Sequence, residues 1–187
     1  MTSQQRPGED PVAAVAIHGS CAFRKARRWR SLEDKEIIRL AVCACLDLKA
    51  HIPLAVSLNL GPRVAERVGD IDWLRRRLVY HLQVALWRLP DCIFVWGVTG
   101  SRLHVHAAIL ARSTGEQERI RRALLTAAGE WGSRQHKRHQ LHVQTIRDEG
   151  WAGYMALHLR SSRNAPNGGW SMTKRMRDLA KNALTKK

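Results

Sequence analysis

Apolar residues recur along the chain with two different periods, and each period predicts one type of secondary structure. Where every second residue is apolar we expect a β-strand, because successive strand side chains point to opposite faces. Where apolar residues return every three or four positions we expect a helix. The first pattern predicts strands over residues 52–60, 92–98, 102–111 and 141–146. The second predicts helices over residues 31–50, 72–89, 113–132 and 151–160, then, after a loop at 161–170, a last helix from Ser171.

The elements between residues 52 and 147 follow the order strand, helix, strand, strand, helix, strand. This is the split βαβ order, so the chain is predicted to be an α+β protein with a ferredoxin-like antiparallel sheet (βαββαβ). A tyrosine-bearing helix follows the last strand, and helices extend both ends. We expect the helices to cover one face of the sheet and to leave the other free for a ligand. The chain divides into a basic arm (1–30), a central domain (31–163), and a loop with a basic C-terminal helix (164–187).

Basic residues outnumber acidic ones, 32 Lys and Arg against 16 Asp and Glu, and the formal net charge is +16. This charge favours a polyanionic partner, and nucleic acid is the first expectation, ahead of an anionic membrane surface. No apolar run is long enough to span a bilayer, and Met1–Pro11 does not resemble a secretory signal. We therefore expect a cytoplasmic protein without a membrane partner. Its four cysteines are expected to be reduced core residues, with a structural zinc site as the alternative.

Two histidines on one predicted strand are the most informative residues of the chain. In Leu103-His-Val-His-Ala107 the apolar residues face one side, so His104 and His106 face the other. Two neutral imidazoles side by side can bind a divalent metal ion. The alternative is a pair of ordinary, half-exposed histidines on a basic protein.

The chain has two tyrosines, and their surroundings differ. Tyr80 lies in the middle of a predicted helix and is expected to be a core or boundary aromatic. Tyr154 lies on the helix that directly follows the fourth strand. His158 comes one turn later, on the same side of that helix.

With these motifs in this order, residues 52–163 resemble the HUH single-stranded DNA endonucleases, which include rolling-circle replication initiators (Rep proteins) and single-tyrosine transposases. The matching segments are Ala55-Val-Ser-Leu-Asn-Leu60 as the first-strand motif, Leu103-His-Val-His-Ala107 as the metal motif, and Trp151-Ala-Gly-Tyr154 as the nucleophile motif. The tyrosine follows the histidines, as in the Rep and transposase branches; in conjugative relaxases it precedes them.

The resemblance implies a mechanism and a metal site. A Mg²⁺ or Mn²⁺ ion on His104 and His106 would polarise the scissile phosphate, and Tyr154 would attack it. The products would be a 5′-phosphotyrosine linkage and a free 3′ hydroxyl, so the strand could later be rejoined. Many Rep-like members carry a Glu on the strand before the histidines, but Val95-Trp-Gly-Val98 has no acid. The third ligand is therefore open: His158 is the first choice, His142 the second and Asn59 the third.

The expected substrate is single-stranded DNA at a hairpin or origin site, in the bacterial cytoplasm, for replication of a plasmid or phage. A separate helicase would have to unwind the duplex, because the chain has no helicase motif. Trp151 and Trp170 could stack on bases or pack in the core. Alternatives are a transposase of the same chemistry, a non-catalytic nucleic-acid-binding module, and a degenerate HUH fold kept as a regulator. Candidate phosphate contacts are Arg102, Arg112, Arg134, Lys137, Arg138 and Arg160.

Overall fold

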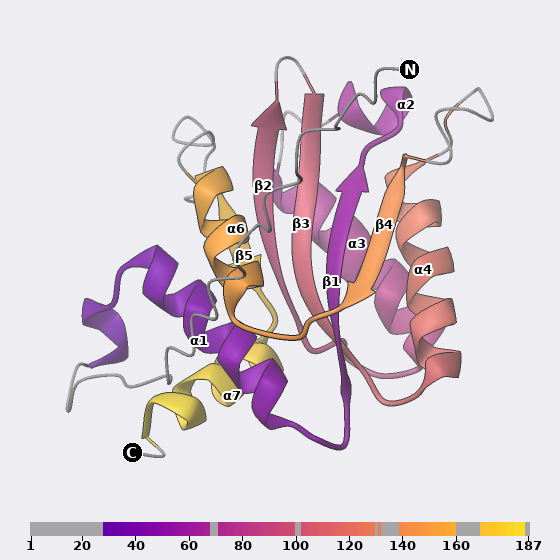
Figure 1. Cartoon of the computed structure of the whole chain (residues 1–187). Coiled ribbons are helices and arrows are strands. Elements are labelled where there is room, and N and C mark those ends of the chain that lie inside the picture. The colour runs from indigo at the N-terminus through magenta and orange to yellow at the C-terminus, as the bar shows by residue number, and fades with distance from the viewer. Residues whose placement is uncertain are drawn as a thin grey trace, which may run out of the picture.

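The computed structural model describes residues 28–67, 71–99, 102–129, 131, 139–159 and 169–185. Over these residues the chain is an α+β fold with one antiparallel sheet of five strands in the order β4-β1-β3-β2-β5 (Figure 1). The strands are β1 (Ile52–Asn59), β2 (Cys92–Thr99), β3 (Arg102–Ala111), β4 (Leu141–Thr145) and β5 (Trp170–Met172). The six α-helices in this part of the chain are α1 (Asp34–Asp47), α2 (Pro62–Ala65), α3 (Ile71–Leu86), α4 (Thr114–Ala128), α6 (Gly150–Leu159) and α7 (Lys174–Thr185).

One face of the sheet packs against α3 and α4, which lie behind it in Figure 1. Alternate strand residues point to this face, and they form the larger of two apolar cores. Val105 and Ala107 of β3, Leu78 of α3 and Leu124 of α4 are at most 1% exposed within it. The strand and helix periods in the sequence therefore predict this half of the fold correctly.

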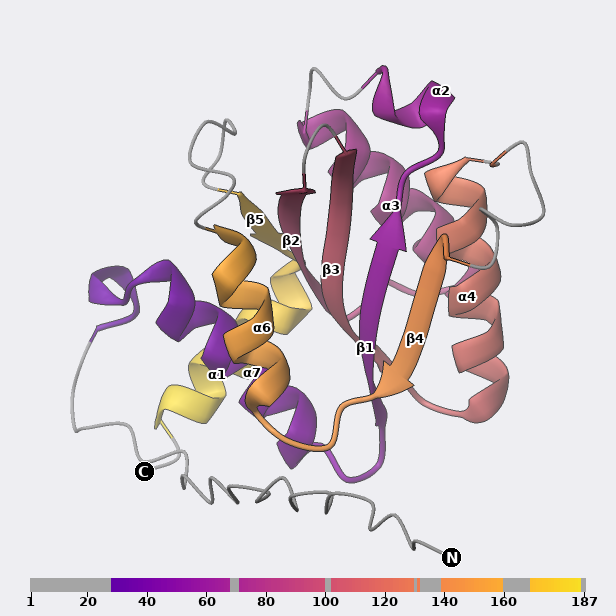
Figure 2. The same ribbon diagram turned by 45° about the horizontal axis from the view of Figure 1, so that its top comes forward.

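The opposite face is covered in part. A second core buries Val95 of β2 and Leu110 of β3 against Ile38 of α1, Met155 of α6 and Met176 of α7. The expectation of one covered and one free face is therefore wrong for the part of the sheet formed by β2, β3 and β5. No described helix lies over β4 and the adjoining part of β1, which stay open on this side (Figure 2).

The C-terminal segment differs from its prediction. The sequence predicts a loop up to residue 170 and a helix from Ser171, but residues 170–172 form β5, in which Met172 pairs with Ile93 of β2. α7 begins at Lys174, after Thr173, whose carbonyl oxygen accepts a hydrogen bond from the backbone N–H of Arg177. A strand of three residues is too short to show a two-residue period, so the hydrophobic pattern does not reveal it.

α3 ends earlier than predicted, at Leu86, because Trp87 adopts a left-handed backbone conformation with φ of 53°. Tyr80, expected in the core or at its boundary, is 63% exposed. The reason is helical phase: Leu78 and Leu82 point into the core, and Tyr80 lies between them on the other side of the helix.

Cys43, Cys45 and Cys92 are buried and not disulfide-bonded, as the sequence predicts, and Cys21 lies outside the described residues. Burial, with a smaller contribution from Asp91, raises the pKa of Cys45 to about 12, so this thiol stays protonated. Among the helices that the structure describes, none combines the length and apolarity needed to cross a membrane.

Candidate metal centre

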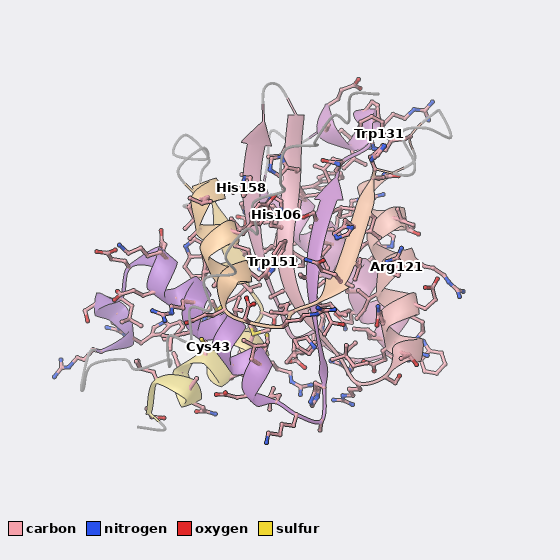
Figure 3. The ribbon with its side chains drawn as sticks, in the orientation of Figure 1. Cys43, His106, Arg121, Trp131, Trp151 and His158 are labelled. Carbon is pink, nitrogen blue, oxygen red and sulfur yellow. The ribbon has the colours of Figure 1, made fainter. Side chains whose placement is uncertain are left out.

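Three imidazoles meet on the partly open face of the sheet, where α6 packs against β2; Figure 3 labels two of them, His106 and His158. His104 and His106 come from β3, and His158 comes from the last turn of α6. One ligand nitrogen from each ring lies within 4.8 Å of the other two, and His104 Nε2 is 3.3 Å from His158 Nδ1. His104 and His106 are 8% and 3% exposed, and His158 is half-buried. The three side chains could therefore hold a metal ion.

The alternation and register of β3 place the first two imidazoles. Val105, between them, points into the core against α3 and α4, so His104 and His106 point toward α6. Within the sheet, His106 lies opposite Ser57 of β1, and His104 lies opposite Gly97 of β2. Directly opposed residues of antiparallel strands point to the same face. Ser57 and Gly97 therefore border the imidazoles.

Packing of α6 places the third imidazole. Ala152 and Met155 are 3% and 0% exposed and fix which side of the helix faces the second core. Tyr154 and His158, one turn apart, then lie on the flank beside His106, whose ring centroid is 4.9 Å from that of Tyr154 and 4.1 Å from that of His158.

A bidentate ion pair holds the start of α6. Glu149 accepts two hydrogen bonds from Arg39 of α1, 2.7 Å from Nε to Oε2 and 3.0 Å from Nη2 to Oε1. The carbonyl oxygen of Glu149 in turn accepts from the backbone N–H of Ala152 at 2.9 Å. Fork-shaped pairs of this kind fix geometry as well as contributing energy. The helix that carries Tyr154 and His158 is thus tied to α1 as well as packed on the sheet.

The absence of a side chain at Gly97 makes room for the centre. A Cβ atom placed there would lie 2.9 Å from Nδ1 of His158 and still closer to Nε2 of His104. Such separations are shorter than real Cβ contacts, so any larger residue would displace an imidazole. The space that a side chain at Gly97 would take is filled by these imidazoles.

Ser57 orients the most buried imidazole. Its Oγ is 3.0 Å from Nδ1 of His106, whereas Nε2 of His106 is buried and has no hydrogen-bond partner in the part of the chain that the structure describes. In the tautomer in which Nδ1–H donates to Ser57, Nε2 carries a lone pair that no hydrogen bond uses. An unpaired buried nitrogen is costly, and coordination to a metal ion would satisfy it.

Burial favours the neutral form of two of the imidazoles, His106 and His158. Burial, then the neighbouring His158 and His104, lower the pKa of His106 from 6.5 to about 3. Burial also lowers the pKa of His158. Neutral imidazole is the form that binds metals, so near neutral pH these donor nitrogens need not lose a proton first.

Tyr154 lies at the edge of this cluster and is 43% exposed. Its ring centroid is 4.9 Å from those of both His106 and His158, and its ring stacks on Trp151 at 5.1 Å and 22°. Trp151 is anchored by a hydrogen bond of 3.1 Å from Nε1 to the carbonyl oxygen of Ala107. The structure thus brings together the four residues for which the sequence predicts metal binding and nucleophilic attack.

An open groove of about 740 Å³ adjoins the centre on the uncovered part of the sheet. Ser57, His142 and Gln144 belong to the strands that form its floor, and Trp151 and Tyr154 line it from α6. A ligand in this groove would reach the edge of the imidazole cluster past Tyr154.

The second and third choices for the metal ligand do not join the cluster. His142 is exposed on β4, which lies two strands, or roughly 10 Å, from β3. Its Nε2 is 3.4 Å from Oε1 of Gln144. Asn59 uses its amide nitrogen to donate to the carbonyl oxygen of His139 at 2.7 Å. His142 therefore lies in the groove, and Asn59 holds the segment before β4.

Few of the predicted phosphate contacts can be placed. Arg112 is exposed just beyond the end of β3 that lies far from His104, so it does not border the centre. Arg134, Lys137, Arg138 and Arg160 lie outside the described residues. The backbone of Arg102 is described as part of β3, but its side chain is not.

The sequence pattern did not single out Ser57 or Gly97. Both residues become visible only when the neighbouring strands are aligned with the strand that carries the histidines, and this register cannot be read from the sequence.

Comparison of the chain with known protein families, with curated proteins and with solved structures finds no match. The resemblance to HUH endonucleases therefore stays a prediction from the motifs.

Proposed function

We propose that the protein is a divalent-metal-dependent, single-tyrosine endonuclease of the HUH type, which cuts and rejoins single-stranded DNA. One observation carries the proposal: an imidazole triad from β3 and α6 lies beside the half-exposed Tyr154. The sequence motifs alone did not require these four side chains to meet. Their meeting supports the proposal, because the reaction needs a site that could hold an electrophilic metal ion and a nucleophile beside it.

The donor set fits a divalent cation. The buried, unpartnered Nε2 of His106 needs a partner, and the pKa values of His106 and His158 are lowered so that both are neutral. Imidazole nitrogen is a poor ligand for Mg²⁺, which prefers oxygen, and a good one for first-row transition ions. Of the two ions considered, the triad therefore favours Mn²⁺. When bound, the ion would act as a Lewis acid on the scissile phosphate.

The chain's own contribution to the reaction is a positioned phenol. The Tyr154 oxygen would form a bond to phosphorus while the bond from phosphorus to the 3′ oxygen breaks. The phenolic proton leaves, the released 3′ oxygen gains one, and the downstream fragment stays linked to the protein through its 5′-phosphate. Attack by that 3′ hydroxyl on the linkage would reverse the step and reseal the strand. Stacking on Trp151 and the packing of α6 restrict where the phenol can lie.

Two further features support DNA as the substrate, and a third supports a ferredoxin-like topology for the sheet and its helices. The net charge of +16 suits a polyanion, and an open groove of about 740 Å³ lies beside Tyr154. The order β4-β1-β3-β2 with α3 and α4 on one face is what a ferredoxin-like βαββαβ unit would give. Within the superfamily we favour a replication initiator of a plasmid or phage over a transposase. It would act at a hairpin or origin in the bacterial cytoplasm, and a separate protein would supply the helicase.

The proposal is tested by incubating the full chain with a library of 5′- and 3′-labelled single-stranded oligonucleotides and Mn²⁺. We expect a protein–DNA adduct that survives denaturation and carries the 3′ label, because the fragment on the 3′ side of the cut keeps the phosphate at its 5′ end. Tyr154→Phe should abolish the adduct and keep Mn²⁺ binding, and His104→Ala should abolish both. An adduct that still forms with Tyr154→Phe would show that another group is the nucleophile.

A non-catalytic nucleic-acid-binding protein is the second candidate. The observation that favours it is the lack of any carboxylate in the metal centre, as far as the described residues go. In that case Mn²⁺ and single-stranded DNA would both bind, but no oligonucleotide would be cut with any divalent ion. Binding of DNA would then be unaffected by His104→Ala.

A further inference from the structure

The groove beside the metal centre lies over β1 and β4, the part of the sheet that no described helix covers (Figure 2). Ser57 of β1 pairs with His106 of β3 on one side and with His142 of β4 on the other. Ala55, two residues earlier, pairs with Gln144 of β4. Directly opposed residues point to the same face, so these side chains share the face of the metal centre. Since β3 and β4 are two strand spacings apart, roughly 10 Å, the small side chains of β1 leave a channel between them.

The lining of this groove offers the three kinds of group that a nucleotide needs. Trp151 and Tyr154 of α6 supply aromatic rings. Gln144 supplies an amide, and Arg147, just after β4, supplies a guanidinium. Aromatic rings contact base faces, amides pair with base edges, and guanidinium groups pair with phosphate. The volume of about 740 Å³ lies within the range of roughly 300–1,000 Å³ that is usual for small-ligand sites.

The amide of Gln144 is exposed in the groove and is held on one side. Nε2 of His142 lies 3.4 Å from its Oε1, and the amide makes no other hydrogen bond within the described part of the chain. An imidazole that donates to Oε1 fixes the orientation of the amide and leaves its nitrogen and the second lone pair of its oxygen for a ligand. An amide presents a donor and an acceptor side by side, the pattern that pairs with N6 and N7 of adenine.

We propose that this groove binds an unpaired adenine nucleotide next to the scissile phosphate, with Gln144 reading the base and Arg147 contacting its phosphate. The proposal rests on the proposed function for its ligand, single-stranded DNA, and adds the base that the protein selects. Arg147 is exposed and is the single Arg or Lys among the described residues that line the groove. Asp148, the single acidic one, accepts a hydrogen bond at Oδ1 from the backbone N–H of Gly150 at 2.8 Å. Arg147 takes part in none of the ion pairs of the described residues, so its guanidinium is available to a phosphate.

Equilibrium binding in EDTA tests base selection without any cutting. Short fluorescein-labelled homo-oligonucleotides of deoxyadenosine, deoxycytidine and thymidine are titrated with the full chain, and fluorescence anisotropy gives each Kd. We expect the deoxyadenosine strand to bind about 5- to 150-fold more tightly than the other two, the discrimination usual for one bidentate pair. Gln144→Leu should remove this preference, and Gln144→Glu should move it to deoxycytidine, whose N4 donates to a carboxylate. Gln83→Leu, a matched change at an exposed Gln on α3, should leave the preference unchanged.

Salt dependence tests the role of Arg147. Loss of one phosphate contact on a single strand reduces the slope of the log binding constant against log salt by about 0.7. Arg147→Gln should reduce the slope by that amount and weaken the binding of all three strands alike, whereas Arg119→Gln, on the exposed side of α4, should do neither.

The proposal is overturned if the wild type binds the three strands equally, if Gln144→Leu keeps the preference, or if Arg147→Gln leaves the slope unchanged. Because EDTA prevents cutting, these results do not depend on whether Tyr154 forms an adduct. An adduct without any base preference would refute the groove proposal alone, and a base preference without an adduct would refute the nuclease proposal alone.

Discussion

Gly97→Ala is the substitution whose effect on the metal centre can be worked out most closely from the structure. The added Cβ would lie 2.9 Å from Nδ1 of His158, against 3.4 Å or more for an ordinary contact, and closer still to Nε2 of His104. Gly97 pairs with His104 of β3, and the neighbouring backbone N–H of Trp96 donates to the carbonyl oxygen of Gly169, so the backbone of β2 cannot easily move away here. His158 must therefore shift by about 0.5 Å, which exceeds the roughly 0.2 Å tolerance of metal–ligand distances.

We expect Gly97→Ala to weaken Mn²⁺ binding by about 10- to 100-fold, the loss usually seen when the support of a metal ligand is disturbed. Overpacking should also lower the free energy of unfolding of the metal-free protein by about 1–3 kcal/mol. Isothermal titration calorimetry measures the first effect, and urea unfolding measures the second.

Gly153→Ala is the matched control, because it adds the same methyl group next to Tyr154 in open space. A Cβ at Gly153 meets no atom within 4 Å, and replacing a helical Gly by Ala stabilises by about 0.5–1 kcal/mol. This variant should keep wild-type Mn²⁺ affinity and unfold at higher urea. If Gly97→Ala bound Mn²⁺ as tightly as the wild type while Gly153→Ala behaved as expected, the imidazoles would not form the site.

Three further predictions follow from the same contacts. Ser57→Ala should weaken Mn²⁺ binding by about 10-fold or more, because it removes the hydroxyl that is hydrogen-bonded to Nδ1 of His106. Ser57→Thr keeps a hydroxyl and should restore the affinity. Equal affinities of the wild type and Ser57→Ala in calorimetry would contradict this role. The metal-free protein should lose stability as pH falls below 6.5, because the unfolded state then binds a proton that buried His106, with a folded-state pKa of about 3, does not. The contribution of this residue to the slope should reach about 1.4 kcal/mol per pH unit, and His106→Gln should reduce the slope by that amount, as urea unfolding at several pH values can check. Glu149→Gln should destabilise the fold by about 1 kcal/mol, because it breaks the partly exposed bidentate pair with Arg39, and unchanged unfolding would show that α6 does not depend on it.

The sequence predicted those parts of the fold that have a clear hydrophobic period. The alternation of Leu103, Val105 and Ala107 correctly placed His104 and His106 on one face, which needed the local geometry of one strand alone. His158, the first choice for the third ligand from the family resemblance, lies with them in one cluster that could hold a metal ion.

The parts that were missed depend on contacts between distant segments. Ser57 and Gly97 gain their roles from strand register, and the covering of the second sheet face depends on the packing of α1 and α7. β5 is a strand because β2 offers it an edge to pair with, and its own three residues do not show it. No local period encodes such pairings, so they become visible when the chain is folded.

Identification of the residue that carries the DNA tests the account most directly. The denatured adduct from the Mn²⁺ reaction is digested with nuclease and protease, and the peptide that retains a nucleotide is sequenced by mass spectrometry. We predict one modified peptide, from α6, with the 5′-phosphate on Tyr154. A nucleotide on any other side chain, or no adduct from a protein shown to bind both Mn²⁺ and the oligonucleotide, would contradict the proposed reaction.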